Sequence, residues 1–196
     1  MKLVFATNNL NKLAEIQALV PSGIEILSLH DIKCIVELPE TNPTLEQNAV
    51  QKATYINTHY GFNCFADDTG LEIESLGGAP GVYSARYAGE DCNAEDNIQK
   101  VLKMLKGEDK RVAKFRTVIA LIVDGKTTIF QGECQGSINN TKSGLKGFGY
   151  DPIFIPDGFN ITFAEMNKAQ KGLISHRGKA VKKLVQFLNS CSAKMD

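Results

Sequence analysis

The segment from Cys64 to Gly70 constrains the fold most strongly, because it joins a short apolar run directly to charged and turn-forming residues. The apolar residues Cys64 to Ala66 predict a buried strand of a sheet that is flanked by other elements. Two adjacent carboxylates, Asp67 and Asp68, follow this strand. Ligands of open α/β sheets bind at the carboxyl ends of strands, and a buried carboxylate needs a partner. We therefore expect a hard-cation site here, most simply for Mg²⁺; an ordinary turn is the alternative.

Length and charge narrow the possible classes of protein. The chain has 196 residues and a mass of 21.4 kDa, which predicts one domain over residues 1–196 or two intimate lobes. Lysine plus arginine equals aspartate plus glutamate, 22 against 22, so no overall basic field indicates nucleic acid as a partner. The apolar run from Val118 to Val123 is too short to cross a bilayer, and the beginning of the chain lacks a signal-peptide pattern. We expect no membrane partner.

The cysteines are typical of a reducing compartment. They are five in number, scattered, and form no Cys-x-x-Cys pair: Cys34, Cys64, Cys92, Cys134 and Cys191. This pattern predicts reduced thiols in the cytoplasm rather than a disulfide framework. With only three histidines in the chain, a zinc enzyme is also disfavoured.

The first segment reads as a strand, a polar turn and a helix. An apolar strand from Lys2 to Ala6 runs into the turn from Thr7 to Lys12, and a helix with an apolar stripe then continues until Pro21. Free N–H groups at a helix start, together with a lysine, favour phosphate binding. Simple helix capping by asparagine is the alternative, and no Walker loop is present.

The next segments alternate strand and helix. A weak strand over residues 24–27 precedes a polar loop that contains Glu40. A capping-box pattern at Thr44 to Gln47 then opens a helix that carries Lys52 and ends at Gly61. A strand resumes over residues 71–73, before a Gly/Pro-rich loop over residues 76–89 that has the composition of a functional surface.

The second half of the chain contains the clearest hairpin. Asn93 is expected to cap a helix, and strands over residues 115–123 and 127–138 turn at Asp124-Gly125. A glycine-rich segment around Phe148 follows, and then a strand over residues 153–155. We expect a short helical turn over residues 162–167 and a last helix that opens at Ser175.

Four polar clusters interrupt this α/β pattern. They are Thr7 to Lys12; Glu40 with Asp67 and Asp68; Phe148 to Asp151; and Lys171 with Ser175 to Arg177. Each has an ordinary structural alternative: lysines are usually solvated, a phenylalanine usually belongs to the core, and a histidine at a helix start often caps or packs. Carboxylates for a metal, several cations and an aromatic ring together suit a nucleoside triphosphate.

The motifs in these clusters resemble those of the inosine/xanthosine triphosphate pyrophosphatase family, which removes deaminated purine nucleotides. Six motifs in the same order carry the resemblance over nearly the whole chain: Ala6-Thr7-Asn8-Asn9 through Lys12, Ala66-Asp67-Asp68-Thr69-Gly70-Leu71, Gly77-Gly78-Ala79-Pro80-Gly81, Ser84-Ala85-Arg86-Tyr87, Gly147-Phe148-Gly149-Tyr150-Asp151-Pro152, and Ser175-His176-Arg177-Gly178.

The resemblance implies hydrolysis of ITP, dITP and XTP at the α–β phosphate bond, with Mg²⁺, to a monophosphate and pyrophosphate. Asp68 would be the general base and, with Glu40, a metal ligand. Phe148 would stack on the purine, Asp151, His176 and Arg177 would read its edge, and the first turn and Lys52 would hold phosphates. The implied substrate-binding set is Thr7, Asn8, Asn9, Leu10, Asn11, Lys12, Lys52, Thr69, Phe148, Gly149, Tyr150, Asp151, Lys171, His176 and Arg177.

The family resemblance also implies a homodimer, for which the Gly77 to Tyr87 loop is the expected contact. One position departs from the family pattern: Asn8 stands where Gly is frequent, and Asn tolerates left-handed backbone better than most residues. From the placement of the clusters we expect an elongated, two-lobed α/β fold with a mixed central sheet and the active site in the cleft between the lobes.

Three other functions compete with this one. A phosphatase with an aspartyl nucleophile is disfavoured, because it needs acids two apart on one strand face, whereas adjacent acids point to opposite faces. A pyrophosphatase for modified pyrimidine nucleotides is disfavoured by the His176-Arg177 pair. A nucleotide-binding regulator without catalysis stays open, and a turnover assay with ITP and Mg²⁺ distinguishes it from an enzyme.

Overall fold

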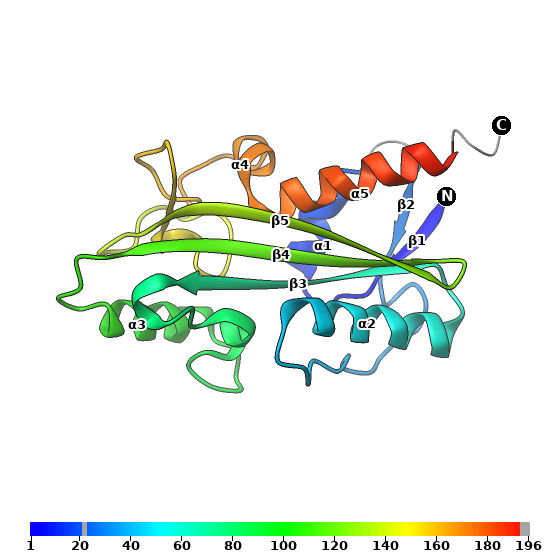
Figure 1. The fold of residues 1–196 in the computed structure, drawn as a ribbon, viewed down its shortest axis with the longest axis horizontal. Helices are drawn as coiled ribbons and strands as arrows, with labels where there is room; N and C mark the ends of the chain where they lie inside the picture. The colour runs from blue at the N-terminus through cyan, green and yellow to red at the C-terminus, as the bar shows by residue number, and fades with distance from the viewer. Residues whose placement is uncertain (21–22, 193–196) are drawn as a thin grey trace. The chain divides into compact units, whose positions relative to one another are not determined.

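The structure is a computed structural model that describes residues 1–20 and 23–192 (Figure 1). Within this part of the chain a six-stranded sheet has the order β2-β1-β3-β4-β5-β6. The strands are β1 (Lys2–Phe5), β2 (Glu25–Leu27), β3 (Cys64–Ile73), β4 (Val112–Val123), β5 (Lys126–Ile138) and β6 (Phe154–Pro156). β1 is parallel to β2 and β3, whereas β5 and β6 are antiparallel. The predicted α/β class with a mixed sheet is confirmed.

The helices begin and end largely at the residues whose chemistry predicts it. They are α1 (Leu10–Gln17), α2 (Leu45–Tyr60), α3 (Ala94–Met104), α4 (Lys168–Ile174) and α5 (His176–Ser192). Asn9, Thr44 and Asn93 cap the first three through side-chain oxygens that accept N–H groups of the first turn. Gly61 ends α2 in a left-handed conformation, with φ at 70°.

The chain folds into two compact units, each with a hydrophobic core of its own. Unit 1 comprises residues 1–68, 117–132 and 177–196. In unit 1, α2 and α5 cover opposite faces of the sheet strands (Figure 1). The α5 face buries the phenylalanines of β1 and β3, which stack with ring centroids 4.7 Å apart. The principal residues of this core are Leu3, Phe5, Ile16, Phe65, Ile119, Leu121, Val181 and Leu184.

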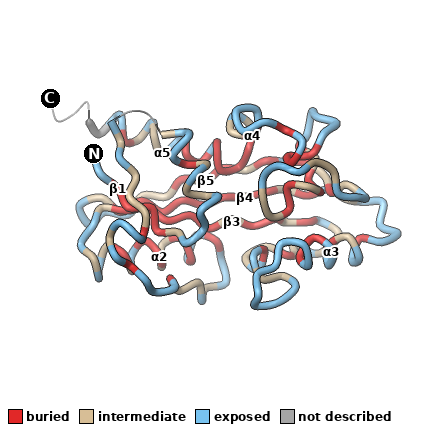
Figure 2. Tube along the Cα trace, turned by 180° about the vertical axis from the view of Figure 1, so that it is seen from behind, coloured by how far each residue is buried: buried red, intermediate tan, exposed pale blue. Residues whose placement is uncertain are grey.

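Unit 2 comprises residues 69–116 and 133–176. Helix α3 packs against β3 and β4 through Ile98 and Val101, and its C-cap Leu105 belongs to the same core. The burial colours of Figure 2 show that β3 and β4 are buried along most of their length, whereas β5 alternates between buried and more exposed residues. The principal residues of this core are Leu71, Ile73, Ile98, Val101, Phe115, Ile153, Phe154 and Phe163.

Strand β3 corrects the prediction that the acidic pair follows the end of a strand. It runs without a break through Asp67, Asp68 and the threonine and glycine after them, so the two acids lie in the middle of β3. Aspartate is a poor strand former, but its low propensity yields to tertiary contacts. Both carboxylates here contact cations of other elements, which compensates for their place in a buried strand.

The remaining elements confirm some predicted bounds and correct others. The hairpin turns at Asp124-Gly125 as expected, with φ of 50° and 74°. Within residues 162–167 the chain makes a hydrogen-bonded turn, in which Glu165 N donates to Thr162 O at 3.1 Å, and the regular helix α4 starts only after its N-cap Asn167. Helix α1 ends at Gln17, and the expected stop, Pro21, lies outside the described residues. The loop over residues 76–89 is partly regular, since Gly81–Arg86 form a 3₁₀ helix.

Throughout residues 1–20 and 23–192, no helix combines the length and the apolar character that crossing a membrane requires.

Candidate active site

The two adjacent aspartates of β3 have different partners. Asp67 is fully buried and accepts a hydrogen bond from Lys12 Nζ at 3.0 Å. Asp68 is 6% exposed and accepts one from the amide of Asn48 at 3.2 Å, while Lys52 Nζ lies 3.9 Å from its other oxygen. Successive strand residues point to opposite faces, so each carboxylate meets a different set of groups.

Lys52 of α2 gathers several oxygens around one ammonium group. Its Nζ contacts Glu40 Oε1 in an ion pair and donates to the backbone oxygen of Asp67 at 2.7 Å. Burial alone would lower the pKa of Lys52, but the nearby carboxylates of Asp68, Glu40 and Asp67 outweigh it and raise the pKa. The carboxylates of Glu40 and Asp68 therefore both lie near the positively charged Nζ of Lys52.

The pKa values of the two aspartates shift in opposite directions. Burial raises the pKa of Asp68, and the negative charge of Glu40 raises it further. The positive charge of Lys52 lowers this pKa but does not outweigh the other two causes. Burial also acts to raise the pKa of Asp67, but Lys12, Arg177 and Lys52 overcome it and hold that pKa well below its usual range. Asp67 is therefore a permanent anion, and Asp68 is the more basic of the two.

The turn from Thr7 to Lys12 connects β1 to α1 as predicted. Asn9 caps the helix: its Oδ1 accepts from Asn11 N at 3.0 Å and from Lys12 N at 3.1 Å, so these two N–H groups have partners within the chain. Residues 8–11 are exposed. Asn8 does not use the left-handed backbone that Gly permits, because its φ is not positive.

A second group lies in unit 2, on the loop before β6 and on α4. Asp151 is 3% exposed, and one of its oxygens accepts both from the backbone N–H of Phe148 and from Lys171 Nζ, each at 2.8 Å. Lys171 Nζ also lies 5.0 Å from the centroid of the Phe148 ring. Phe148 is half-buried and thus not a core residue.

The other predicted binding residues of unit 2 are placed as follows. Tyr150 belongs to the core, and its hydroxyl donates to Ser84 O at 2.9 Å, so a ligand contact there would come from the backbone. His176 is buried and stacks on Phe115 with ring centroids 4.5 Å apart. Thr69 is half-buried in β3, directly after Asp68.

Arg177 and His176 are neighbours in sequence but belong to different units. The guanidinium of Arg177 is 3% exposed and lies among the charged residues of unit 1. Its Nη1 donates to Glu15 at 2.5 Å, and its Nε and Nη2 lie 3.4 and 3.5 Å from Asp67. The structure therefore groups Arg177 with the cations near the acidic pair, and the reading of a base edge by Arg177 stays a prediction.

Sequence reasoning missed two residues of this group. Glu15 lies three residues after Lys12 on α1, a spacing that places both on one helix face. Asn48 lies four residues before Lys52 on α2; it is 1% exposed and links Asp68 to the backbone N–H of Asn42. Both residues could have been found from the sequence, because each lies three or four residues from a candidate lysine on the same helix.

In the part of the chain that the structure describes, no three or more His, Cys, Asp or Glu side chains come together as a metal-binding group. The carboxylates of Glu40 and Asp68 form a pair, because both contact the ammonium group of Lys52. This number suits Mg²⁺, which proteins usually hold through one or two carboxylates, water and substrate phosphates.

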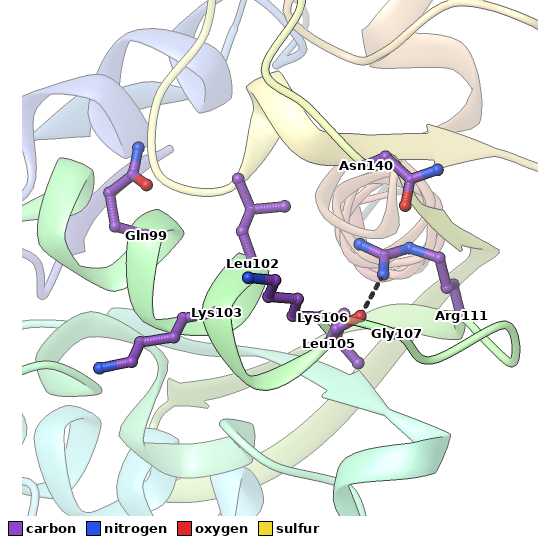
Figure 3. Close-up of a pocket in the computed structure, with 8 residues that line it drawn as sticks. All are labelled: Gln99, Leu102, Lys103, Leu105, Lys106, Gly107, Arg111 and Asn140. Carbon is purple, nitrogen blue, oxygen red and sulfur yellow. Dashed lines mark hydrogen bonds between the residues drawn. The ribbon is translucent and has the colours of Figure 1, made fainter.

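Unit 2 also contains a pocket of about 500 Å³ that includes none of the predicted site residues (Figure 3). Arg111 lines it, and its guanidinium donates to three backbone oxygens, of Ile138, Leu105 and Asn139, at 2.7 to 2.9 Å. The bond to Leu105 satisfies a carbonyl at the end of α3. This arginine stabilises the fold locally.

The comparisons with known proteins agree with these motifs. Residues 3–187 match the model of the Ham1 family, and the chain belongs to this family. It is 57% identical to the dITP/XTP pyrophosphatase of Christiangramia forsetii, over 96% of this chain and 100% of that protein, and 55% identical to that of Flavobacterium johnsoniae, over 97% and 99%. Among solved structures it resembles the Ham1 protein of Staphylococcus aureus, with a TM-score of 0.88 and 38% identity over 97% of this chain and 99% of that one.

Proposed function

We propose that this protein hydrolyses the deaminated purine nucleotides ITP, dITP and XTP at the α–β phosphate bond, releasing a monophosphate and pyrophosphate. The single observation that carries the proposal is the setting of Asp68, a buried carboxylate of raised pKa beside Glu40 and Lys52. The names of the relatives supply the substrate class, since two at 57% and 55% identity are dITP/XTP pyrophosphatases.

Asp68 has the properties of a general base. A carboxylate whose pKa is raised takes up a proton more readily at neutral pH than an ordinary one does. Asn48 holds one oxygen of Asp68 and thereby orients the group. In the proposed reaction, Asp68 accepts the proton of the attacking water while the bond between the α- and β-phosphates breaks and pyrophosphate leaves.

The charge balance of unit 1 supports a requirement for Mg²⁺. The ion-paired group contains three cations, Lys12, Lys52 and Arg177, against four carboxylates, Glu15, Glu40, Asp67 and Asp68. With all of them ionised, this group alone does not attract a polyanion. We propose that Glu40 and Asp68 hold Mg²⁺, which when bound neutralises charge on the phosphoryl oxygens.

The remaining residues are assigned to parts of the nucleotide. Thr7, Asn9, Lys12 and Lys52 would hold phosphates, because they surround the start of α1 and the acidic pair. The half-buried ring of Phe148 would stack on the purine, and Lys171 is held beside that ring by Asp151. His176 and Arg177 would donate to the oxygen at C6, where adenine has an amino group that also donates.

We test this function by measuring pyrophosphate release from ITP, dITP, XTP and ATP. The wild-type protein should turn over the first three with Mg²⁺, prefer them to ATP, and lose activity with a chelator. Asp68→Asn should lower kcat by about 10²- to 10⁴-fold while ITP binding is largely kept. Glu25→Gln removes an exposed carboxylate paired with Lys2 and is the matched control. Binding of ITP without turnover would favour a regulator, and normal turnover by Asp68→Asn would assign the base to another residue.

Assembly and location belong to the same proposal. We propose a homodimer in the cytoplasm. The exposed Tyr83, with the guanidinium of Arg86 5.5 Å from its ring, supports a contact at the Gly77 to Tyr87 loop. Cys34, Cys64, Cys92 and Cys134 are free thiols, which supports a reducing compartment. Sedimentation equilibrium should give twice the mass of the chain.

A further inference from the structure

Four charged side chains of unit 1 form a continuous chain of ion pairs. Lys12 contacts Asp67, Asp67 contacts Arg177, and Arg177 contacts Glu15. The side chains of Asp67 and Arg177 are 0% and 3% exposed, whereas that of Glu15 is 24% exposed. Glu15 is therefore the solvent-facing end of a buried electrostatic chain that starts at a proposed phosphate ligand.

The two carboxylates hold Arg177 unequally. Nη1 of Arg177 donates a charge-assisted hydrogen bond to Glu15 Oε2. Asp67 Oδ2 lies 3.4 and 3.5 Å from Nε and Nη2, at the limit of hydrogen bonding, and its other oxygen is engaged by Lys12. Of these two carboxylates, Glu15 makes the contact that fixes the guanidinium more firmly.

Glu15 also connects two elements that the chain separates widely. It lies on α1, one helical turn after Lys12, whereas Arg177 lies in the first turn of α5, 162 residues away in sequence. Helix α1, which carries the proposed phosphate ligand Lys12, is thus tied to Arg177 directly. Asp67 adds a second connection, because it contacts both Lys12 and Arg177.

We infer that Glu15 is a positioning residue, which holds the guanidinium of Arg177 in the orientation that the nucleotide meets. The inference rests on the proposed function for the identity of that nucleotide. Without the carboxylate of Glu15, the guanidinium loses the closer of its two carboxylate contacts, and more of its side-chain freedom must then be lost when the nucleotide binds. The ion pairs of Lys52 with Glu40 and Asp68 do not involve the pair of Glu15 and Arg177, so we expect them to stay in place.

The test compares Glu15→Gln, Arg177→Lys and the double variant. Glu15→Gln should lower kcat/KM for ITP by about 10- to 100-fold, chiefly through KM, because it removes the charge from a partly buried charge-assisted hydrogen bond. In the Arg177→Lys background the same substitution should have little further effect, because the guanidinium that Glu15 holds is absent from that variant. Glu25→Gln on β2 should retain wild-type kinetics, and thermal unfolding should show Glu15→Gln folded.

A second measurement follows the arginine itself. The Nε–Hε cross-peak of Arg177, assigned by its loss in Arg177→Lys, should shift or broaden in Glu15→Gln and stay in place in Glu25→Gln. Unchanged kinetics and an unchanged cross-peak in Glu15→Gln would overturn the inference, as would full additivity in the double variant. A wild-type protein that does not turn over ITP would refute the proposed function instead, and the cross-peak would still decide whether Glu15 holds Arg177.

Discussion

Asp67 and Asp68 show how one residue type acquires two properties from its surroundings. They are adjacent in β3, yet the pKa of Asp67 is lowered by Lys12, Arg177 and Lys52, whereas burial raises that of Asp68. When two carboxylates of one site have well-separated pKa values, they commonly play different roles in the reaction. Here the permanently charged Asp67 organises cations, and the more basic Asp68 is available for proton transfer.

Cys64, at the start of β3, gives a prediction for the effect of pH on stability. Burial raises the pKa of this thiol from 9.0 to about 12, and its Sγ donates to Ala53 O. The unfolded chain loses this proton near pH 9 and the folded one near pH 12, so alkali favours unfolding. The contribution is intact below pH 9 and falls by about 1.4 kcal/mol per pH unit above it.

Urea unfolding at pH 8 and pH 10.5 measures this loss. Cys64→Ala should lose less stability over that interval than the wild type does, because it has no thiol to ionise in the unfolded state. The exposed Cys92 is the control, and Cys92→Ala should keep the wild-type dependence. Equal losses in Cys64→Ala and the wild type would show that this thiol does not carry the effect.

The loop before β6 is built around a single carboxylate oxygen. Asp151 Oδ2 accepts from both Phe148 N and Lys171 Nζ, and so fixes the aromatic ring and the lysine together. The loop can close on that oxygen only because residue 147 is a glycine. An added Cβ at Gly147 would lie 2.0 Å from Asp151 Oδ2, and φ there is +77°.

Gly147→Ala should therefore damage nucleotide binding specifically. The methyl group displaces the Asp151 carboxylate, and we expect kcat/KM for ITP to fall by about 10- to 100-fold, as misplacement of binding groups does elsewhere. Gly158→Ala is the control, because φ is +82° there too but an added Cβ has nothing within 4 Å. It should lose stability through backbone strain and keep its kinetics. A similar kinetic loss in both variants would assign the effect to strain.

The sequence predicts local signals well and distant contacts poorly. The caps Asn9 and Asn93 and the Asp124-Gly125 turn were predictable, because their chemistry acts within a few residues. The continuity of β3 through its acids was not predictable, because Lys12 and Arg177 stabilise it from far along the chain.

The candidate site shows the same difference between local signals, which the sequence predicts, and distant contacts, which it does not. Its residue types were recognisable from six motifs, but the partners of each residue were not. Nothing in the sequence separates His176, which packs on Phe115, from Arg177, which contacts Glu15. Their different partners follow from tertiary packing rather than from a local pattern.

At the scale of the whole molecule, three strands contribute to both units. β3, β4 and β5 each cross a unit boundary without a break, and each is hydrogen-bonded to its neighbour in the sheet order. We therefore expect the two hydrophobic cores to unfold in one cooperative transition.

Calorimetry of two core variants tests this cooperativity. Phe65→Ala in unit 1 and Phe154→Ala in unit 2 remove fully buried rings, and each should cost about 3–5 kcal/mol. Each should move a single transition to lower temperature, by about 10 °C for a chain of this size. Resolved transitions, with each variant shifting a different one, would show that the units melt independently.

The same continuity bears on how this architecture can change during evolution. Unit 1 is assembled from three stretches of chain and unit 2 from two, with boundaries after residues 68, 116, 132 and 176. Exchanging one unit between two homologous genes would need a crossover at each of these four boundaries, three of which fall inside strands. A single recombination event would mix both cores, so we expect the proposed phosphate-binding and base-binding residues to be inherited together and to diverge mainly by point substitution.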